Sequence, residues 1–490
     1  MSWRLAIDAL DPQGNPKTLR FAMPGYVDPA PIRWWQRIQQ PGLYRAGLFA
    51  GELLRVDRSG YGETTLINND RALDWLVDYA TDGRRAVLEY ENEGMLTTVL
   101  EGTVARVSFG SSLVSIKLRD PVEILQQPHP LTRFAGTNVE PDGLEGTDDD
   151  IGGNVKPRLY GQVRNAQPVL VNGSKLIYQI SDQDCTVSAV YDSGVALDFD
   201  GDYSSLAELE GTAPTAGEWS DWEPPRGKWR RYQGYIRIGQ APAGQLTCDA
   251  NAPLVNAGDV IEQIAGEAGV SVASVGALNS RGAVRLWVTS ETTTAALLDR
   301  LVASCAGYYR LTGTQTIDAD LLAPPGVPVL TLNDHQIITI DRDSAGAGSN
   351  GLPIGRVTWQ ADRIETVQEN LAGGVGESRR ARLASQYRDA VAVSNATLQR
   401  HPLADAITLA SDLASRSKAQ TTANDVLALL SLRRDRLTVV ARVKDAGALD
   451  VNQTIRIVTP RLGYSAGRNV LIVGRLVDAS KNRISLTLWG

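Results

Sequence analysis

The feature that most constrains the fold of this chain is the shortness of its apolar runs, which turn residues interrupt along most of the sequence. Residues 85–90, 96–107 and 112–118 form three such runs, and each has the length and composition of a strand. The 46 glycines and 23 prolines supply the turns between runs of this kind. The pattern favours several β-rich domains over a helical bundle.

The predicted fold class is mainly β with α+β insertions: several small barrel-like or sandwich-like β-domains, one small α/β module, and one long helix before a terminal β-domain. At 490 residues the chain is too long for one compact core, so roughly three or four domains are expected. The predicted units are an N-terminal β-domain with one helix (1–127), a linker or long exposed loop (128–155), a β-domain (156–252), a small α/β module (253–325), a β-rich connector (326–403), and a helix with a C-terminal barrel-like domain (404–490).

Apolar residues at helical spacing predict four helices. One follows Asp70 in the first domain, two cover 258–268 and 292–306 in the α/β module, and the longest runs from 404 to about 432, with 420–422 as a candidate interruption. The module also contains predicted strands at 283–288 and 308–311, and the terminal domain contains predicted strands at 437–443, 453–458, 469–477 and 483–489.

Charge and hydropathy exclude several classes of partner. The formal net charge of -7 argues against sequence-independent DNA binding, which needs clustered Lys and Arg, and no specific nucleic-acid binding is expected. The basic stretch 379–382 has Glu377 and Asp389 nearby, so we interpret it as a solvated face. The N-terminus lacks the apolar core of a signal peptide, and no apolar run approaches the ~18 residues of a membrane helix. The expectation is a chain that folds in a cytoplasm without inserting into a membrane.

Two motifs suggest an enzyme, and their context argues against it. Residues 463–467 match the GxSxG nucleophile elbow, but strands are predicted on both sides of Ser465, and the last histidine, His401, precedes it. Residues 346–351 match GxGxxG, but Leu352-Pro353 follows where a helix should begin. A hairpin loop and a flexible loop are the predicted structures, and no catalytic residue is assigned.

The chain also lacks an obvious ligand set for a metal or cofactor. Cys185, Cys248 and Cys305 are far apart and are expected to be buried free thiols. The three histidines, His129, His335 and His401, are equally scattered. Residues 198–202 resemble part of a calcium loop but lack its later glycine and glutamate, so a β-turn with solvated acids is predicted, with a weak cation site as the alternative. No cofactor and no metal are expected.

An aromatic cluster stands apart from these motifs. It comprises Trp219, Trp222, Trp229, Tyr232 and Tyr235. Core and edge packing of a β-domain is the first interpretation, and a subunit interface and a glycan-binding site are the alternatives, because Trp and Tyr combine an apolar face with a polar tip.

Two stretches resemble tail proteins of long-tailed bacteriophages and prophages. The first contains 156–163, 176–179 and 234–249, which are similar to the "KPxxYG", "YQ" and "RLGxxPAGxxTxD" segments of those proteins. The second is the C-terminus, whose closing residues 484–490 are similar to a "TLTLWG" strand. Asn452-Gln453 departs from the glycine-acid turn of the pattern, and Cys248 replaces a smaller residue.

The resemblance implies a structural subunit of the tail tip or baseplate, near the distal tail ring or the hub. It implies a homo-oligomeric ring, a trimer or a hexamer, that joins the tail tube and tape-measure protein to fibres or receptor-binding proteins. The chain would then be part of the virion, assembled in the host cytoplasm. A host-surface glycan-binding tail protein is the alternative function, and a tail-associated hydrolase that depends on Ser465 is the remaining one.

Overall fold

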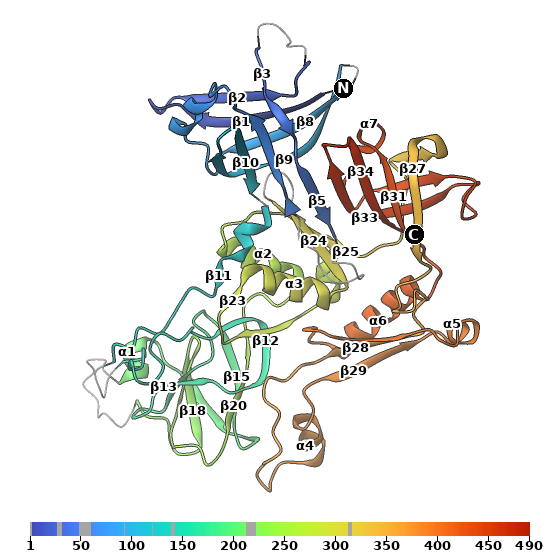
Figure 1. Ribbon diagram of the computed structural model, residues 1–490. Coiled ribbons are helices and arrows are strands. Elements are labelled where there is room, and N and C mark those ends of the chain that lie inside the picture. Colours follow the sequence, from blue (N-terminus) through green and yellow to red (C-terminus); the bar gives the residue numbers. More distant parts are fainter. Residues whose placement is uncertain are drawn as a thin grey trace.

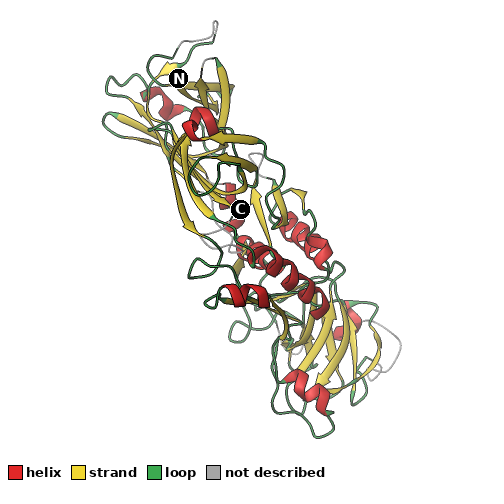
Figure 2. Cartoon of the chain, turned by 90° about the vertical axis from the view of Figure 1, so that its right-hand side faces the viewer, coloured by secondary structure: helices red, strands yellow, loops and turns green. Residues whose placement is uncertain are grey.

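The computed structural model describes residues 2–26, 32–48, 60–92, 94–119, 121–138, 143–211, 222–311 and 316–490. The chain is mostly β, with several sheets and few helices, which confirms the predicted fold class (Figure 1). The molecule is elongated, with β-rich bodies at both ends and helices concentrated between them (Figure 2). In the part of the chain that the structure describes, no helix combines the length and apolar character needed to cross a membrane.

The first barrel is an eight-stranded sheet in the order β3-β2-β1-β8-β9-β10-β7-β4. Its strands are β1 (Ser2–Leu10), β2 (Pro16–Ala22), β3 (Trp35–Gln36), β4 (Ile38–Gln40), β7 (Glu63–Ile67), β8 (Arg85–Asn92), β9 (Met95–Phe109) and β10 (Leu113–Arg119). β3 and β4 lie at opposite ends of this order, yet only Arg37 separates them in the chain. One kinked segment therefore nearly closes the sheet on itself.

The helix predicted after Asp70 is only a 3-10 turn, η1 (Asp74–Asp78). Leu73 and Leu76 are both buried, and their spacing of three residues suits the tighter helix.

A sandwich of two five-stranded sheets follows, in the orders β16-β15-β20-β12-β22 and β13-β14-β19-β18-β17. Its strands are β12 (Arg158–Ala166), β13 (Val169–Asn172), β14 (Ile177–Gln179), β15 (Thr186–Asp192), β16 (Val195–Ala196), β17 (Asp198–Asp202), β18 (Lys228–Tyr232), β19 (Tyr235–Ile238), β20 (Leu246–Asn251) and β22 (Arg285–Val288), with the short helix α1 (Leu206–Glu210) beside them. Val163, Val187, Trp229 and Ile236 are buried in its core.

The α/β module contains the predicted helices as α2 (Ala257–Glu267) and α3 (Thr294–Ser304). Its other elements are β21 (Val272–Ser274), η4 (Leu278–Arg281), β23 (Thr292–Thr293), β24 (Gly307–Leu311) and β25 (Ile317–Leu321). The predicted strand 283–288 is β22, which pairs with β12. The module is therefore joined to the sandwich by a shared sheet and does not close on itself.

The segment predicted as an exposed linker is partly buried. It begins after η2 (Pro121–Gln126) with β11 (Pro128–His129), and it is otherwise irregular. Phe134 and Leu144 are buried, and they pack with Ile177 and Leu209 of the sandwich. The prediction of exposure was wrong for these residues, because two isolated apolar side chains are enough to fix an irregular segment against a neighbouring domain.

The second half of the connector supplies β28 and β29 of a small sheet in the order β29-β28-β30. Its elements are β28 (Arg356–Ala361), α4 (Glu377–Leu383), β29 (Arg388–Val393), α5 (Asn395–Arg400), β30 (Ala406–Ala410) and α6 (Arg416–Leu430). The long helix begins at Arg416 and not at 404, because Ile407 and Leu409 alternate as strand residues and pair with β28. Residues 420–422 do not interrupt it.

The second barrel has the order β26-β32-β33-β34-β31-β27. Its elements are β26 (Leu330–Asn333), η5 (Asp334–Gln336), β27 (Ile337–Ser344), β31 (Arg436–Arg442), α7 (Val443–Ala446), β32 (Thr454–Val458), β33 (Arg468–Asp478) and β34 (Arg483–Trp489). The four strands predicted near the C-terminus are all present. β26 and β27 lie at opposite ends of the order and are joined by η5, so this barrel closes by the same device as the first.

Asp435 is completely buried beside the second barrel and gives its stability a defined pH dependence. Burial raises the pKa of Asp435, but hydrogen bonds from Arg433, Arg342 and Tyr464 outweigh burial and lower the pKa to about 2. The unfolded carboxylate takes up its proton first, so the free energy of unfolding should fall as the pH decreases from about 4 to about 2. Asp435→Asn should remove this decline and cost about 3 kcal/mol at neutral pH. Denaturant unfolding at several pH values measures both effects, and the exposed Asp343→Asn is the control. If the free energy of unfolding of the wild type and of Asp435→Asn fell in parallel with pH, the prediction would be contradicted.

Candidate functional site at the domain junctions

The two barrels are joined by a strand that leaves the first and extends the second. β5 (Leu43–Gly47) forms a hairpin arm with β6 (Gly60–Tyr61) and pairs antiparallel with the second half of β33. The Leu48 N–H donates to Val473 O at 2.8 Å and continues this ladder. Figure 1 shows β5 between the barrels. The joint is thus a continuous main-chain ladder and not a flexible linker.

Side chains reinforce this barrel joint. Trp3 Nε1 donates to Asn482 Oδ1 at 2.6 Å, which links the first strand of one barrel to a turn of the other. Arg475 donates to the carbonyl oxygens of Leu449 and Val99, one in each barrel. A cavity of about 270 Å³ remains beside these contacts, and Tyr309 from the α/β module lines part of it.

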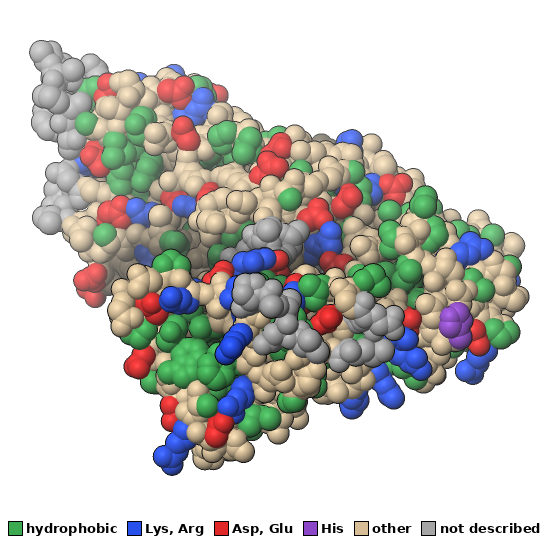
Figure 3. Space-filling model, turned by 90° about the horizontal axis from the view of Figure 1, so that it is seen from above, with side chains coloured by type: hydrophobic (Ala, Val, Ile, Leu, Met, Phe, Trp, Pro, Cys, Tyr) green, Lys and Arg blue, Asp and Glu red, His purple; other side chains and the backbone are tan. Residues whose placement is uncertain are grey.

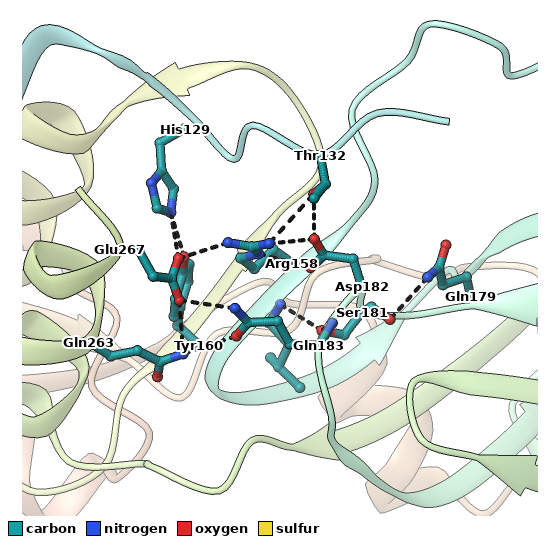
Figure 4. Close-up of polar contacts among 11 residues, drawn as sticks. His129, Thr132, Arg158, Tyr160, Gln179, Ser181, Asp182, Gln183, Gln263 and Glu267 are labelled. Carbon is teal, nitrogen blue, oxygen red and sulfur yellow. Dashed lines mark hydrogen bonds and ion pairs between the residues drawn. The ribbon is translucent and has the colours of Figure 1, made fainter. Parts of the chain in front are cut away.

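A second joint, the polar junction, surrounds Arg158 in β12 (Figure 4). Its guanidinium donates from Nε to Asp182 Oδ1 at 2.8 Å and from Nη1 to Glu267 Oε2 at 2.7 Å. Asp182 follows β14 of the sandwich, whereas Glu267 is the last residue of α2. The bidentate geometry of arginine therefore ties the sandwich to the α/β module.

Tyr160 of β12 and His129 of β11, a third segment, complete the polar junction. Tyr160 Oη donates to Glu267 Oε2 at 2.6 Å and also forms a hydrogen bond with His129 Nε2. His129 Nε2 lies 3.4 Å from Glu267 Oε2. Because His129 lies in β11, the segment that leads out of the first barrel converges on the same carboxylate.

Burial and neighbouring charges set the protonation states in the polar junction. Burial lowers the pKa of His129; Glu267 and Asp182 oppose this shift, and Arg158 adds to it. Burial would raise the pKa of Glu267, but the hydrogen bonds from Tyr160 and Gln183 and the charge of Arg158 keep it below its ordinary value. Burial, followed by the charge of Glu267, raises the pKa of Tyr160. A neutral His129 beside an ionised Glu267 is the resulting state at neutral pH.

The "KPxxYG" residues owe their positions to this packing. Gly161 has a φ of +70°, and a Cβ there would lie 2.2 Å from Val284 O. Lys156 forms an ion pair with Glu145 and lies over the ring of Phe134. The motif thus holds the irregular segment 143–155 against the sandwich and brings β12 close to Val284, the residue before β22.

The described residues of the polar junction form their hydrogen bonds with one another. A general base must reach a substrate proton, yet the carboxylates here accept from Arg158, Tyr160 and Gln183. Among the described residues, no group of three or more His, Cys, Asp or Glu is placed to hold a metal ion. The chemistry of both joints is that of attachment.

The enzyme-like motifs occupy turns, as predicted. Ser465 is exposed in the turn between β32 and β33, without a following helix. Residues 346–351 form a loop before β28, but Ser349 Oγ donates to Asp405 Oδ2 at 2.7 Å and fixes its path. The predicted β-turn at 198–202 is wrong: this segment is strand β17, and Asp200 forms ion pairs with Lys228 and Arg230. Parallel pairing with β18 explains the difference.

The described members of the aromatic cluster pack within the sandwich. Trp229 is buried, and Trp222, Tyr232 and Tyr235 are half-buried against the small core that includes Phe134. Trp219 lies outside the described residues. All three cysteines are buried free thiols, as predicted, and burial raises the pKa of Cys185 to about 12. His335 and His401 lie far along the chain from the polar junction, in η5 and at the end of α5.

Sequence analysis did not identify Asp182, Glu267 or His129 as members of one site. The three residues come from separate elements, and 138 positions separate His129 from Glu267. The arginine and tyrosine of the "KPxxYG" stretch were the available signal, since an arginine in an otherwise buried strand requires acidic partners. No spacing rule indicates which acids those are.

The sequence matches no protein-family model and no curated protein. Several solved structures have a distantly similar fold, and three tail proteins are among them. They are the tail protein from Neisseria meningitidis MC58 (9% identity, TM-score 0.43, covering 100% of this chain and 96% of that one), the 43 kDa tail protein of prophage MuSo2 from Shewanella oneidensis (9%, 0.41, 99% and 96%), and prophage tail protein gp18 from Listeria monocytogenes EGD-e (8%, 0.35, 100% and 94%).

Removing the central cation of the polar junction should be costly. Arg158→Ala leaves Asp182 and Glu267 without their shared partner, so the free energy of unfolding should fall by about 3–5 kcal/mol. Arg158→Lys should recover only part of the loss, because an ammonium cannot donate in a planar fork. Chemical denaturation measures the change, with the exposed Arg226→Ala as control; equal stabilities for Arg158→Ala and Arg226→Ala would contradict the role of Arg158.

His129 should make the protein less stable in mild acid. Its folded pKa lies below the ordinary value of 6.5, so the unfolded chain takes up the proton first. Stability should therefore be complete above about pH 7 and should decline below about pH 6.5. His129→Gln should flatten this decline between about pH 7 and pH 5, while the exposed His335→Gln should leave it unchanged. Urea unfolding across this range is the measurement, and an unchanged slope in His129→Gln would contradict the assignment.

Proposed function

We propose that this chain is a non-enzymatic structural subunit of a bacteriophage tail tip or baseplate, where copies of it form a ring or hub. The observation that carries the proposal is the barrel joint: one chain holds two nearly closed β-barrels and fixes them side by side through the β5–β33 ladder. A rigid pair of this kind is a building block for a closed ring, because each copy presents the same pair of surfaces to its neighbours.

The rigidity extends from the barrels to the sandwich. The segment leading out of the first barrel, the sandwich and the α/β module all converge on Arg158, Tyr160 and Glu267. An interface between copies loses less conformational entropy when its surfaces are already held in place. Fixed joints therefore suit a subunit in which the two ends of an elongated molecule must keep a defined orientation relative to each other.

The residues that carry the resemblance to tail proteins serve the scaffold. Gly234 and Gly239, in the second part of the first stretch, are packed so closely that a Cβ would lie 2.1 Å from Ser181 O and from Pro224 O, respectively. The closing strand β34 lies between β31 and β33, and the Gly490 carbonyl accepts from the Asp435 N–H at 2.8 Å. Motifs that fix tight packing support a structural role over a catalytic one.

In the particle we expect this chain to contact the tail tube, the tape-measure protein, and fibres or receptor-binding proteins. The expected location is the virion, after assembly of a trimer or hexamer in the host cytoplasm. The glycan-binding alternative gains no support from the aromatic cluster, since Trp229 is buried and three of its neighbours are half-buried.

A ring-forming subunit should have a defined mass in solution. We expect light scattering on the purified chain to give three or six times 52.8 kDa, and labelled antibodies to place the chain at one end of the tail. Ring contacts that bury apolar surface should persist in salt, which weakens purely ionic association. A stable monomer that never enters a particle would overturn the proposal.

A further inference from the structure

The three-stranded sheet beside the second barrel has two edges, and α6 protects only one of them. On the β29 edge, Arg416 Nε donates to Asp389 O and Gln420 Nε2 donates to Val391 O, each at 2.8 Å. These side chains occupy acceptors that a further strand would use. Proteins commonly blunt edge strands in this way and so prevent pairing with other chains.

The opposite edge, formed by β30, has no such protection among the described residues. The Ser411 N–H donates to Gln360 O, and Asp405 O accepts from the Gly355 N–H, so the odd-numbered residues face β28. By alternation, the main-chain groups of Ala406, Thr408 and Ala410 point outward. Their side chains are small and exposed. The unpaired edge is about 17 Å long.

The open edge borders a preformed groove. The start of β30 lines a groove of about 1240 Å³, together with the loop 346–351, β5 residues, the half-buried Thr487 and the edge of the buried Trp489 ring. Asp405 holds the loop through both the main-chain N–H and the hydroxyl of Ser349. The groove therefore has a shape that does not depend on a ligand. Figure 3 shows the molecule from above, where hydrophobic side chains gather in small patches among charges of both signs.

We propose that the β30 edge is a strand-addition site, which receives an extended polypeptide segment from a different protein of the same particle. The added segment pairs with the outward N–H and C=O groups of Ala406, Thr408 and Ala410, and its side chains lie in the groove. Recognition of this kind draws affinity from main-chain hydrogen bonds and specificity from the pockets beside them. The inference rests on the proposed function, because it takes its partner from the tail.

A second copy of this chain is the less suitable occupant. Two β30 edges could pair with each other only about a two-fold axis, whereas neighbours in a cyclic ring are related by rotation about the ring axis. Both barrels are nearly closed, whereas the three-stranded sheet ends at β30 among the described residues. An extended segment of another protein satisfies the β30 edge without breaking the symmetry of the ring.

Thr408→Pro tests the pairing directly. Proline removes the outward N–H, and edge strands tolerate proline where that group faces solvent, so the variant should fold. We expect it to form the same oligomer as the wild type but to enter particles at least tenfold less efficiently in a complementation assay. Thr408→Val is the matched control: it keeps the N–H and the β-branched shape, and it should assemble normally.

Hydrogen exchange supplies a second readout that does not depend on a variant. In the purified oligomer, the amides of residues 406, 408 and 410 should exchange rapidly, and in assembled particles they should become protected. Protection already present in the oligomer would show that a second copy covers the edge and would overturn the inference. Normal assembly of Thr408→Pro would also overturn the strand-addition inference and leave the proposed function intact. Failure of the wild type to enter particles would overturn the proposed function itself.

Discussion

The main-chain N–H and C=O groups of a strand need hydrogen-bond partners on both of its sides, and this requirement shapes the two barrels and the joint between them, whereas β30 keeps one open edge. A sheet that ends in solvent leaves rows of N–H and C=O groups exposed, which can pair with any other chain. Both barrels meet the requirement by closing on themselves through one kinked segment, β3–β4 in the first and β26–β27 in the second. The joint between them meets it again, since β5 pairs with the part of β33 that β32 does not reach.

Local pattern was sufficient to predict the fold class and most individual elements. The alternation of residues 437–443 and 483–489 predicts two strands, and the structure pairs them with each other as β31 and β34. The helix 258–268 was equally clear, since its buried residues follow helical spacing. Where local signals conflicted, tertiary pairing decided: residues 406–410 suit a helix by composition, yet they form β30 because β28 offers an edge beside them.

The joints could not be predicted in the same way, because their residues are remote in sequence. The β5–β33 ladder pairs residue 43 with residue 478, and no periodicity connects the two. The polar junction likewise joins β11, β12 and α2 through Glu267. Arg158 and Tyr160 were noticed only as parts of a motif, since the acids that neutralise a buried arginine are determined by the fold and not by spacing. The domains are held together by these long-range contacts, so the sequence alone indicated the elements and not the residues that join them.

The position of β34 has a consequence for synthesis of the protein. This strand is the last in the sequence, but it lies inside the sheet, between β31 and β33. During translation the second barrel therefore cannot close until residues 483–489 have left the ribosome. A chain that ends before them leaves β31 and β33 each with an unpaired edge at the centre of the sheet. Because β33 also carries the joint to the first barrel, such a fragment cannot hold the barrel pair in place. The fixed geometry of the barrel pair therefore requires translation through residues 483–489.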